Sequence, residues 1–103
     1  YPLDHPHYEV DLLAIVSPKV VKMLPLLTAI GYKVVVRAAP VRIEEVENKN
    51  YRDRADTSGC CGLTELIKLE GFTLAEYWKV LLLDMDSLMV GEVDALWEMD
   101  TGI

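Results

Sequence analysis

The sequence has few cysteines, few basic residues and no long apolar run, and each shortage excludes a class of protein. Its two cysteines, Cys60 and Cys61, are neighbours, so a disulfide between them would be strained and a zinc site with four cysteine ligands is excluded. We interpret them as small residues in a tight turn. Lysine and arginine total 10 against 17 aspartates and glutamates. This balance argues against a nucleic acid or an anionic membrane as the main partner.

No stretch reaches the roughly 18 apolar residues that a membrane-spanning helix needs, so we expect no membrane contact from this segment. The 103 residues are 51% hydrophobic and 26% charged, which is typical of one small globular domain. The chain starts at Tyr1 and ends at Ile103, directly after a helix-like run. We therefore expect residues 1–103 to be an internal part of a larger domain. The net charge of −7 still permits a nucleotide ligand, because a divalent cation can supply positive charge locally.

The first third of the chain has the pattern of a strand, a helix and a second strand. The apolar run 12–16 is typical of a buried strand. Ser17 followed by Pro18 is typical of a helix start, and Gly31 of its end. A second strand signal covers 32–36. Short connections between these elements predict a βαβ unit and a parallel sheet.

The rest of the chain continues the α/β pattern after a polar interval. Residues 37–62 contain few apolar side chains and predict an irregular connection, with a short helical turn around 43–47. Helical spacing returns over 63–70, and Gly71 should stop that helix. Val80–Leu83 predicts a third buried strand, and residues 92–99 predict a short amphipathic helix. The fold class that follows is α/β with a mainly parallel sheet.

The third predicted strand ends in Asp84-Met85-Asp86. Ligands of open α/β sheets gather at the carboxyl ends of the strands. Two carboxylates after four apolar residues are costly and repel each other unless something compensates their charge. A divalent cation does so, and hard carboxylate oxygens suit Mg²⁺ or Mn²⁺. The alternative is that one aspartate caps the following turn while the other is solvated.

Two enzyme classes use such a pair. In haloacid-dehalogenase-like phosphatases the first aspartate attacks a phosphate, but their pattern continues D-x-D-G-T, whereas Ser87-Leu88 follows here. The second class matches a longer stretch. Residues 74–90, LAEYWKVLLLDMDSLMV, are similar to the signature L-x-x-Y-x-K-V-h-h-h-D-x-D-x-h-x-h (h, apolar) of family 8 glycosyltransferases, the glycogenin and galactinol-synthase type. Residues 93–97 resemble the I-D-x-L-F that follows, and residues 65–69 resemble the family's lysine-bearing helix.

The resemblance implies a GT-A-type, Rossmann-like domain that binds a UDP-sugar, here incomplete, and transfer of a hexosyl group to a carbohydrate, polyol or protein acceptor. Asp84 and Asp86 would bind Mn²⁺, with Mg²⁺ as the alternative, and the backbone at Met85 would lie near the nucleotide. Lys68, sixteen positions before Asp84, would face the sugar-nucleotide. Metal and lysine would together stabilise the charge that grows on the leaving UDP.

The chain departs from the family pattern in one place and lacks two expected parts. The family often has an arginine before the lysine helix, but residues 58–62 contain none, which leaves Arg52 or Arg54 as replacements. The uracil-binding strand should precede Tyr1, and a metal-binding histidine should follow Ile103. We therefore expect this chain alone to be inactive. A non-catalytic fragment or interaction module remains an alternative, and the compartment stays open between cytoplasm and Golgi lumen.

The other prominent side chains near the motif have simpler interpretations. Tyr77, Trp78 and Trp97 are expected to pack against the rest of the domain. Asp94 is expected to lie on the surface of the last helix or to cap it.

Overall fold

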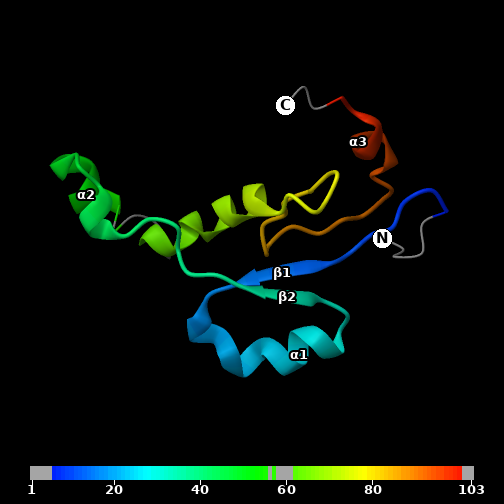
Figure 1. Cartoon of the computed structure of the whole chain (residues 1–103), viewed down its shortest axis with the longest axis horizontal. Helices are drawn as coiled ribbons and strands as arrows, with labels where there is room; N and C mark the ends of the chain where they lie inside the picture. Colours follow the sequence, from blue (N-terminus) through cyan, green and yellow to red (C-terminus); the bar gives the residue numbers. More distant parts are fainter. Residues whose placement is uncertain (1–5, 56, 58–61, 101–103) are drawn as a thin grey trace.

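A parallel pair of strands lies at the centre of the computed structural model, which describes residues 6–55, 57 and 62–100 (Figure 1). β1 (Leu13–Val16) pairs with β2 (Lys33–Val36), so that Leu13 faces Lys33 and Val16 faces Val36. Both strands lie where the apolar runs predicted them. The parallel pairing confirms the βαβ unit. Cys60 and Cys61 lie outside the described residues.

The crossover between the strands begins and ends at the predicted residues. The Ser17 hydroxyl accepts a hydrogen bond from the backbone two residues on, at 3.3 Å, and starts η1 (Pro18–Met23). α1 (Leu24–Ala29) follows directly. A kink lies inside η1 at Val20, which departs from helical geometry with φ −103° and ψ 24°. Gly31 ends the crossover with φ +102°, a conformation that favours glycine.

Helices lie on opposite sides of the strand pair. α1 lies beside β2, and η3 (Gly62–Thr73) lies beside β1 (Figure 1). η3 confirms the position of the helix predicted over 63–70, but it is a 3₁₀ helix. It also continues through Gly71 to Thr73. The glycine therefore does not stop the helix, and Leu82 packs over it instead: a Cβ at Gly71 would lie 3.7 Å from Leu82 Cδ1.

The long polar connection is more regular than its composition predicts. η2 (Ile43–Glu45) confirms the expected helical turn, but α2 (Lys49–Ala55) occupies residues that we expected to be irregular. The Asn48 side chain accepts a hydrogen bond from Tyr51 N at 3.0 Å and so caps this helix. α2 contains few apolar residues, so its sequence has no periodic apolar pattern from which a helix could be predicted.

The third predicted strand does not form. Val80–Leu83 pairs with neither strand of the described sheet and runs extended beside η3. Hydrogen bonds from a side chain, and not from a strand partner, fix the start of this segment. Lys79 Nζ donates to the backbone carbonyls of Trp97 and Met99. Those carbonyls lie at the end of α3 (Asp94–Glu98), which confirms the last predicted helix.

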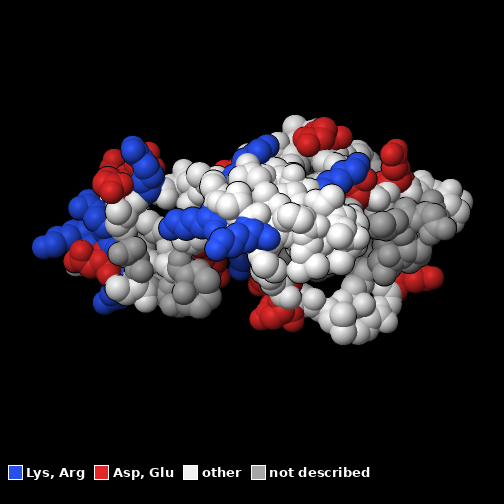
Figure 2. All heavy atoms as spheres, turned by 90° about the horizontal axis from the view of Figure 1, so that it is seen from below, with Lys and Arg blue, Asp and Glu red and all other residues white. Residues whose placement is uncertain are grey.

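The apolar layer of the molecule is thin. Leu74, 7% exposed, is the one buried apolar side chain among the described residues, whereas the residues of β1 are half-buried and Val36 of β2 is exposed. The radius of gyration is 16.2 Å, against about 13 Å for a compact domain of this length. Seen from the α1 side, the middle of the surface is mostly uncharged, and lysines, arginines, aspartates and glutamates are scattered over and around it (Figure 2). No described helix is long and apolar enough to cross a bilayer.

A polar cluster at the amino ends of the strands ties distant segments together. Asp11 Oδ2 accepts hydrogen bonds from Lys33 Nζ at 2.7 Å and from Tyr77 OH at 2.8 Å. Tyr77 therefore anchors the segment before Asp84 to the sheet, 66 residues away along the chain from Asp11. Trp78, by contrast, is 79% exposed, so its predicted packing role is wrong.

The Asp11 cluster predicts a stability loss in acid. The hydrogen bonds from Lys33 and then Tyr77 hold the pKa of Asp11 below its ordinary value of 3.8. A carboxyl group whose pKa is lower in the folded protein than in the unfolded chain stabilises the folded state. This stabilisation is complete at pH values above the unfolded-state pKa, and it is lost as the pH falls through the folded-state pKa. Replacing Tyr77 by phenylalanine removes one of these hydrogen bonds. The variant should therefore be less stable than wild type at pH 6, with a smaller difference at pH 2.5, in urea unfolding.

Candidate functional site

Asp84-Met85-Asp86 forms a turn at the end of the extended segment. Ser87 N donates to Asp84 O at 3.0 Å, and Met85 and Asp86 occupy the two corners. Both aspartates are exposed, and Met85 points fully into solvent. The carboxylates therefore carry no burial cost, contrary to the strand-end expectation. The turn is closed by a backbone carbonyl, and the capping role considered for one aspartate side chain is not seen.

Lys68 of η3 contacts the first of these aspartates. Its Nζ lies 2.7 Å from Asp84 Oδ1 and 3.2 Å from Glu65 Oε1. The hydrogen bonds to Asp84 and then to Glu65 raise the pKa of Lys68 above its ordinary value of 10.5, so the ammonium stays charged at neutral pH. The side chains of Lys68 and Asp84 remain 41% and 53% exposed. The fold thus joins two residues that the sequence resemblance assigned to one site.

Asp86 has no such partner. Its side chain forms no hydrogen bond or ion pair with any residue that the structure describes. The turn therefore presents one paired and one unpaired carboxylate, and the oxygen donors suit Mg²⁺ or Mn²⁺. The described part of the chain contains no group of three or more His, Cys, Asp or Glu side chains that could hold a metal ion. Two carboxylates fit a metal that takes its remaining ligands from phosphate and water, as Mg²⁺ commonly does.

Two hollows bear on what the site can hold. A hollow of about 130 Å³ lies between η3 and the extended segment and is lined by Lys68, Gly71, Phe72, Val80 and Leu82. Ligand pockets usually measure roughly 300–1,000 Å³, so this hollow alone does not enclose a sugar-nucleotide. A second hollow, of about 370 Å³, lies at the Asp11 cluster and is lined by Glu9, Asp11, Glu76, Tyr77 and Trp78. It does not include the aspartates of the turn.

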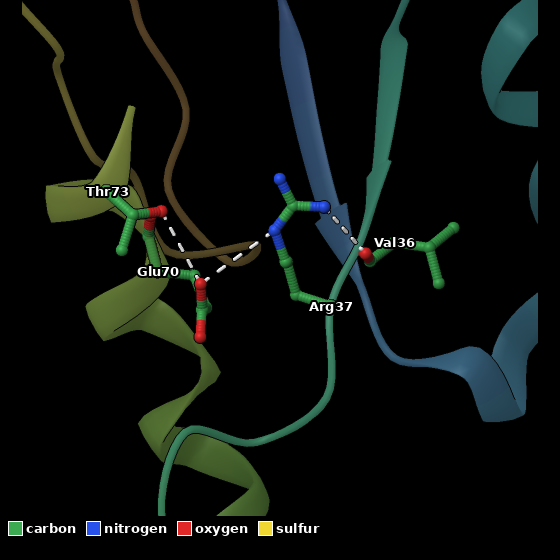
Figure 3. Close-up of polar contacts among 4 residues, drawn as sticks. All are labelled: Val36, Arg37, Glu70 and Thr73. Atoms are coloured by element: carbon green, nitrogen blue, oxygen red, sulfur yellow. Dashed lines mark hydrogen bonds and ion pairs between the residues drawn. The ribbon is translucent and has the colours of Figure 1, made fainter. Parts of the chain in front are cut away.

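The structure places an arginine against η3 that the sequence analysis did not consider. Arg37 directly follows β2; its Nη1 donates to Val36 O at 3.0 Å, and its Nε lies 3.9 Å from Glu70 Oε2 (Figure 3). Arg52, a proposed replacement, instead donates to Val46 O at 2.7 Å and holds α2. The position of Arg37 at the carboxyl end of a predicted strand was the signal that could have identified it.

Glu65 was also overlooked as a partner of Lys68. The i,i+3 spacing of the two residues on a predicted helix was sufficient to suggest the contact.

Comparisons of the chain with models of known protein families, with curated proteins and with solved structures found no match.

Proposed function

We propose that this chain is part of the donor-binding domain of a UDP-sugar-dependent hexosyltransferase, with Asp84 and Asp86 as ligands of Mn²⁺ or Mg²⁺. The observation that best supports this is the 2.7 Å contact between Lys68 and Asp84. Lys68 lies on η3 and Asp84 lies at the start of the turn, sixteen positions apart in the sequence. A lysine and a carboxylate pair beside one turn is the arrangement needed to handle a diphosphate and its metal.

Each residue has a defined task in this proposal. A bound divalent ion supplies positive charge that holds a diphosphate and stabilises the negative charge on the departing UDP. Asp84 and Asp86 hold that ion from one turn, and the exposed backbone at Met85 lies open to the nucleotide. Lys68 adds a second positive charge on the side of η3, toward the sugar-nucleotide. The acceptor, a carbohydrate, polyol or protein, binds outside these residues.

Binding of UDP with and without metal tests the proposal. Titration calorimetry of the purified protein should show UDP binding at least about tenfold tighter in 1 mM Mn²⁺ than in EDTA, because the metal bridges carboxylate and phosphate oxygens. UMP, which lacks the second phosphate, should gain less from the metal. The proposal fails if Mn²⁺ leaves the UDP affinity unchanged.

The phosphatase alternative predicts a different result in the same preparation. A nucleophilic Asp84 would trap a phosphoryl-like fluoride complex, and UDP would compete with it poorly. An interaction module would show neither behaviour, and neither aspartate would matter to it.

A further inference from the structure

We propose that Lys68 occupies the cation position at Asp84 in the free protein, so that metal and nucleotide bind cooperatively: the diphosphate draws Lys68 off Asp84 and frees that carboxylate for the metal. This inference rests on the proposed function and concerns the order of events at the same turn. The observation that motivates it is that the carboxylate expected to bind metal is already bound by an ammonium.

The geometry makes the two cations compete for Asp84. Lys68 Nζ lies 2.7 Å from Asp84 Oδ1, on the oxygen that faces η3. Mg²⁺ binds carboxylate oxygens at about 2.0–2.1 Å, so an ion on this oxygen would meet the ammonium at close range. A monocation and a dication so near each other repel strongly in any protein environment. The free protein therefore binds metal mainly through Asp86.

Lys68 has an alternative partner that makes its release feasible. Glu65 Oε1 lies 3.2 Å from the same ammonium, on the adjacent turn of η3. The lysine side chain is 41% exposed, and its flexible four-carbon stem can swing without disturbing a packed core. An arriving diphosphate offers more negative charge than one carboxylate. Lys68 can thus leave Asp84 for the phosphate while Asp84 turns to the metal.

Coupling of this kind is reciprocal. If UDP raises the affinity for Mn²⁺ by some factor, Mn²⁺ raises the affinity for UDP by the same factor. Lys68 contributes to this coupling factor because it weakens metal binding in the absence of the nucleotide and, once the nucleotide has bound, contacts the diphosphate instead. A lysine that only adds positive charge to the neighbourhood would oppose the metal equally in both states. The coupling factor therefore separates the two roles.

The experiment measures Mn²⁺ binding by the electron paramagnetic resonance of the free ion, with and without saturating UDP. Lys68→Met keeps the length of the side chain and removes its charge. Without UDP, this variant should bind Mn²⁺ about three- to tenfold more tightly than wild type. Its coupling factor with UDP should fall by a similar ratio. Lys22→Met, the same charge change on exposed η1, should leave both quantities within about twofold.

Each outcome decides the matter. Equal Mn²⁺ affinities of wild type and Lys68→Met without UDP overturn the inference, and so does an unchanged coupling factor. If Mn²⁺ binds to neither protein, the metal site itself is wrong and the inference fails with it. If UDP affinity does not respond to metal, the proposed function fails. By reciprocity the proposed cooperativity then fails too, and tighter Mn²⁺ binding by Lys68→Met in the absence of UDP would show only that Lys68 and the metal compete for Asp84.

Discussion

Replacing Asp86 by asparagine is expected to remove the Mn²⁺-dependent part of UDP binding almost completely. Residues that only orient a metal ligand cost about 10–100-fold in metal affinity when they are replaced, so loss of a ligand itself should cost about 100-fold or more. UDP affinity in 1 mM Mn²⁺ should then fall to the value seen in EDTA. Titration calorimetry on wild type and variant, at matched ionic strength, measures both values.

Asp86 is the better aspartate for this test because it forms no hydrogen bond or ion pair within the described chain. Its replacement should leave the fold and the Lys68–Asp84 contact intact, whereas changing Asp84 would also release Lys68. Asp53→Asn, an equal charge change on exposed α2, is the matched control and should behave as wild type. Retention of metal-dependent UDP binding by Asp86→Asn would exclude Asp86 as a metal ligand.

Replacing Leu74 by alanine should lower the free energy of unfolding by about 2–3 kcal/mol. Buried Leu→Ala changes cost about 2–5 kcal/mol, and the thin surroundings of Leu74 can relax around the smaller side chain, which favours the lower end. Leu74 N donates to Gly71 O at 3.4 Å, and its carbonyl accepts from Tyr77 N at 3.2 Å. The residue thus links η3, which carries Lys68, to the segment that carries Asp84. Urea unfolding followed by tryptophan fluorescence measures the change.

Phe72→Ala is the control for the Leu74 prediction. Phe72 lies two residues away but is 80% exposed, so its removal should change stability by no more than about 0.5 kcal/mol. If the two variants lose the same stability, Leu74 is not the packing anchor of this region. A loss of UDP affinity in Leu74→Ala under conditions where the protein remains folded would indicate that the link also positions the turn.

The sequence predicted the elements whose signals are local. β1, β2 and the start and end of the crossover follow from an apolar run, a serine cap and a glycine with positive φ. The same reasoning failed for Val80–Leu83, because an apolar run becomes a strand only when it hydrogen-bonds along another strand, and this run packs beside η3 instead. It also missed α2, because the signal for this helix is the N-cap at Asn48 and not a pattern of apolar residues.

For the candidate site, the sequence alone determined the residue types: two carboxylates one residue apart, and a lysine on a helix before them. Only the tertiary structure decided which of them meet. Lys68 contacts Asp84 but not Asp86, and Asp11 contacts Tyr77 across most of the chain. The physical reason is that contacts between distant segments depend on how elements pack, and a spacing along the chain does not encode that packing. The pairing of Asp84 with a lysine, and its consequence for metal binding, therefore became visible only in the fold.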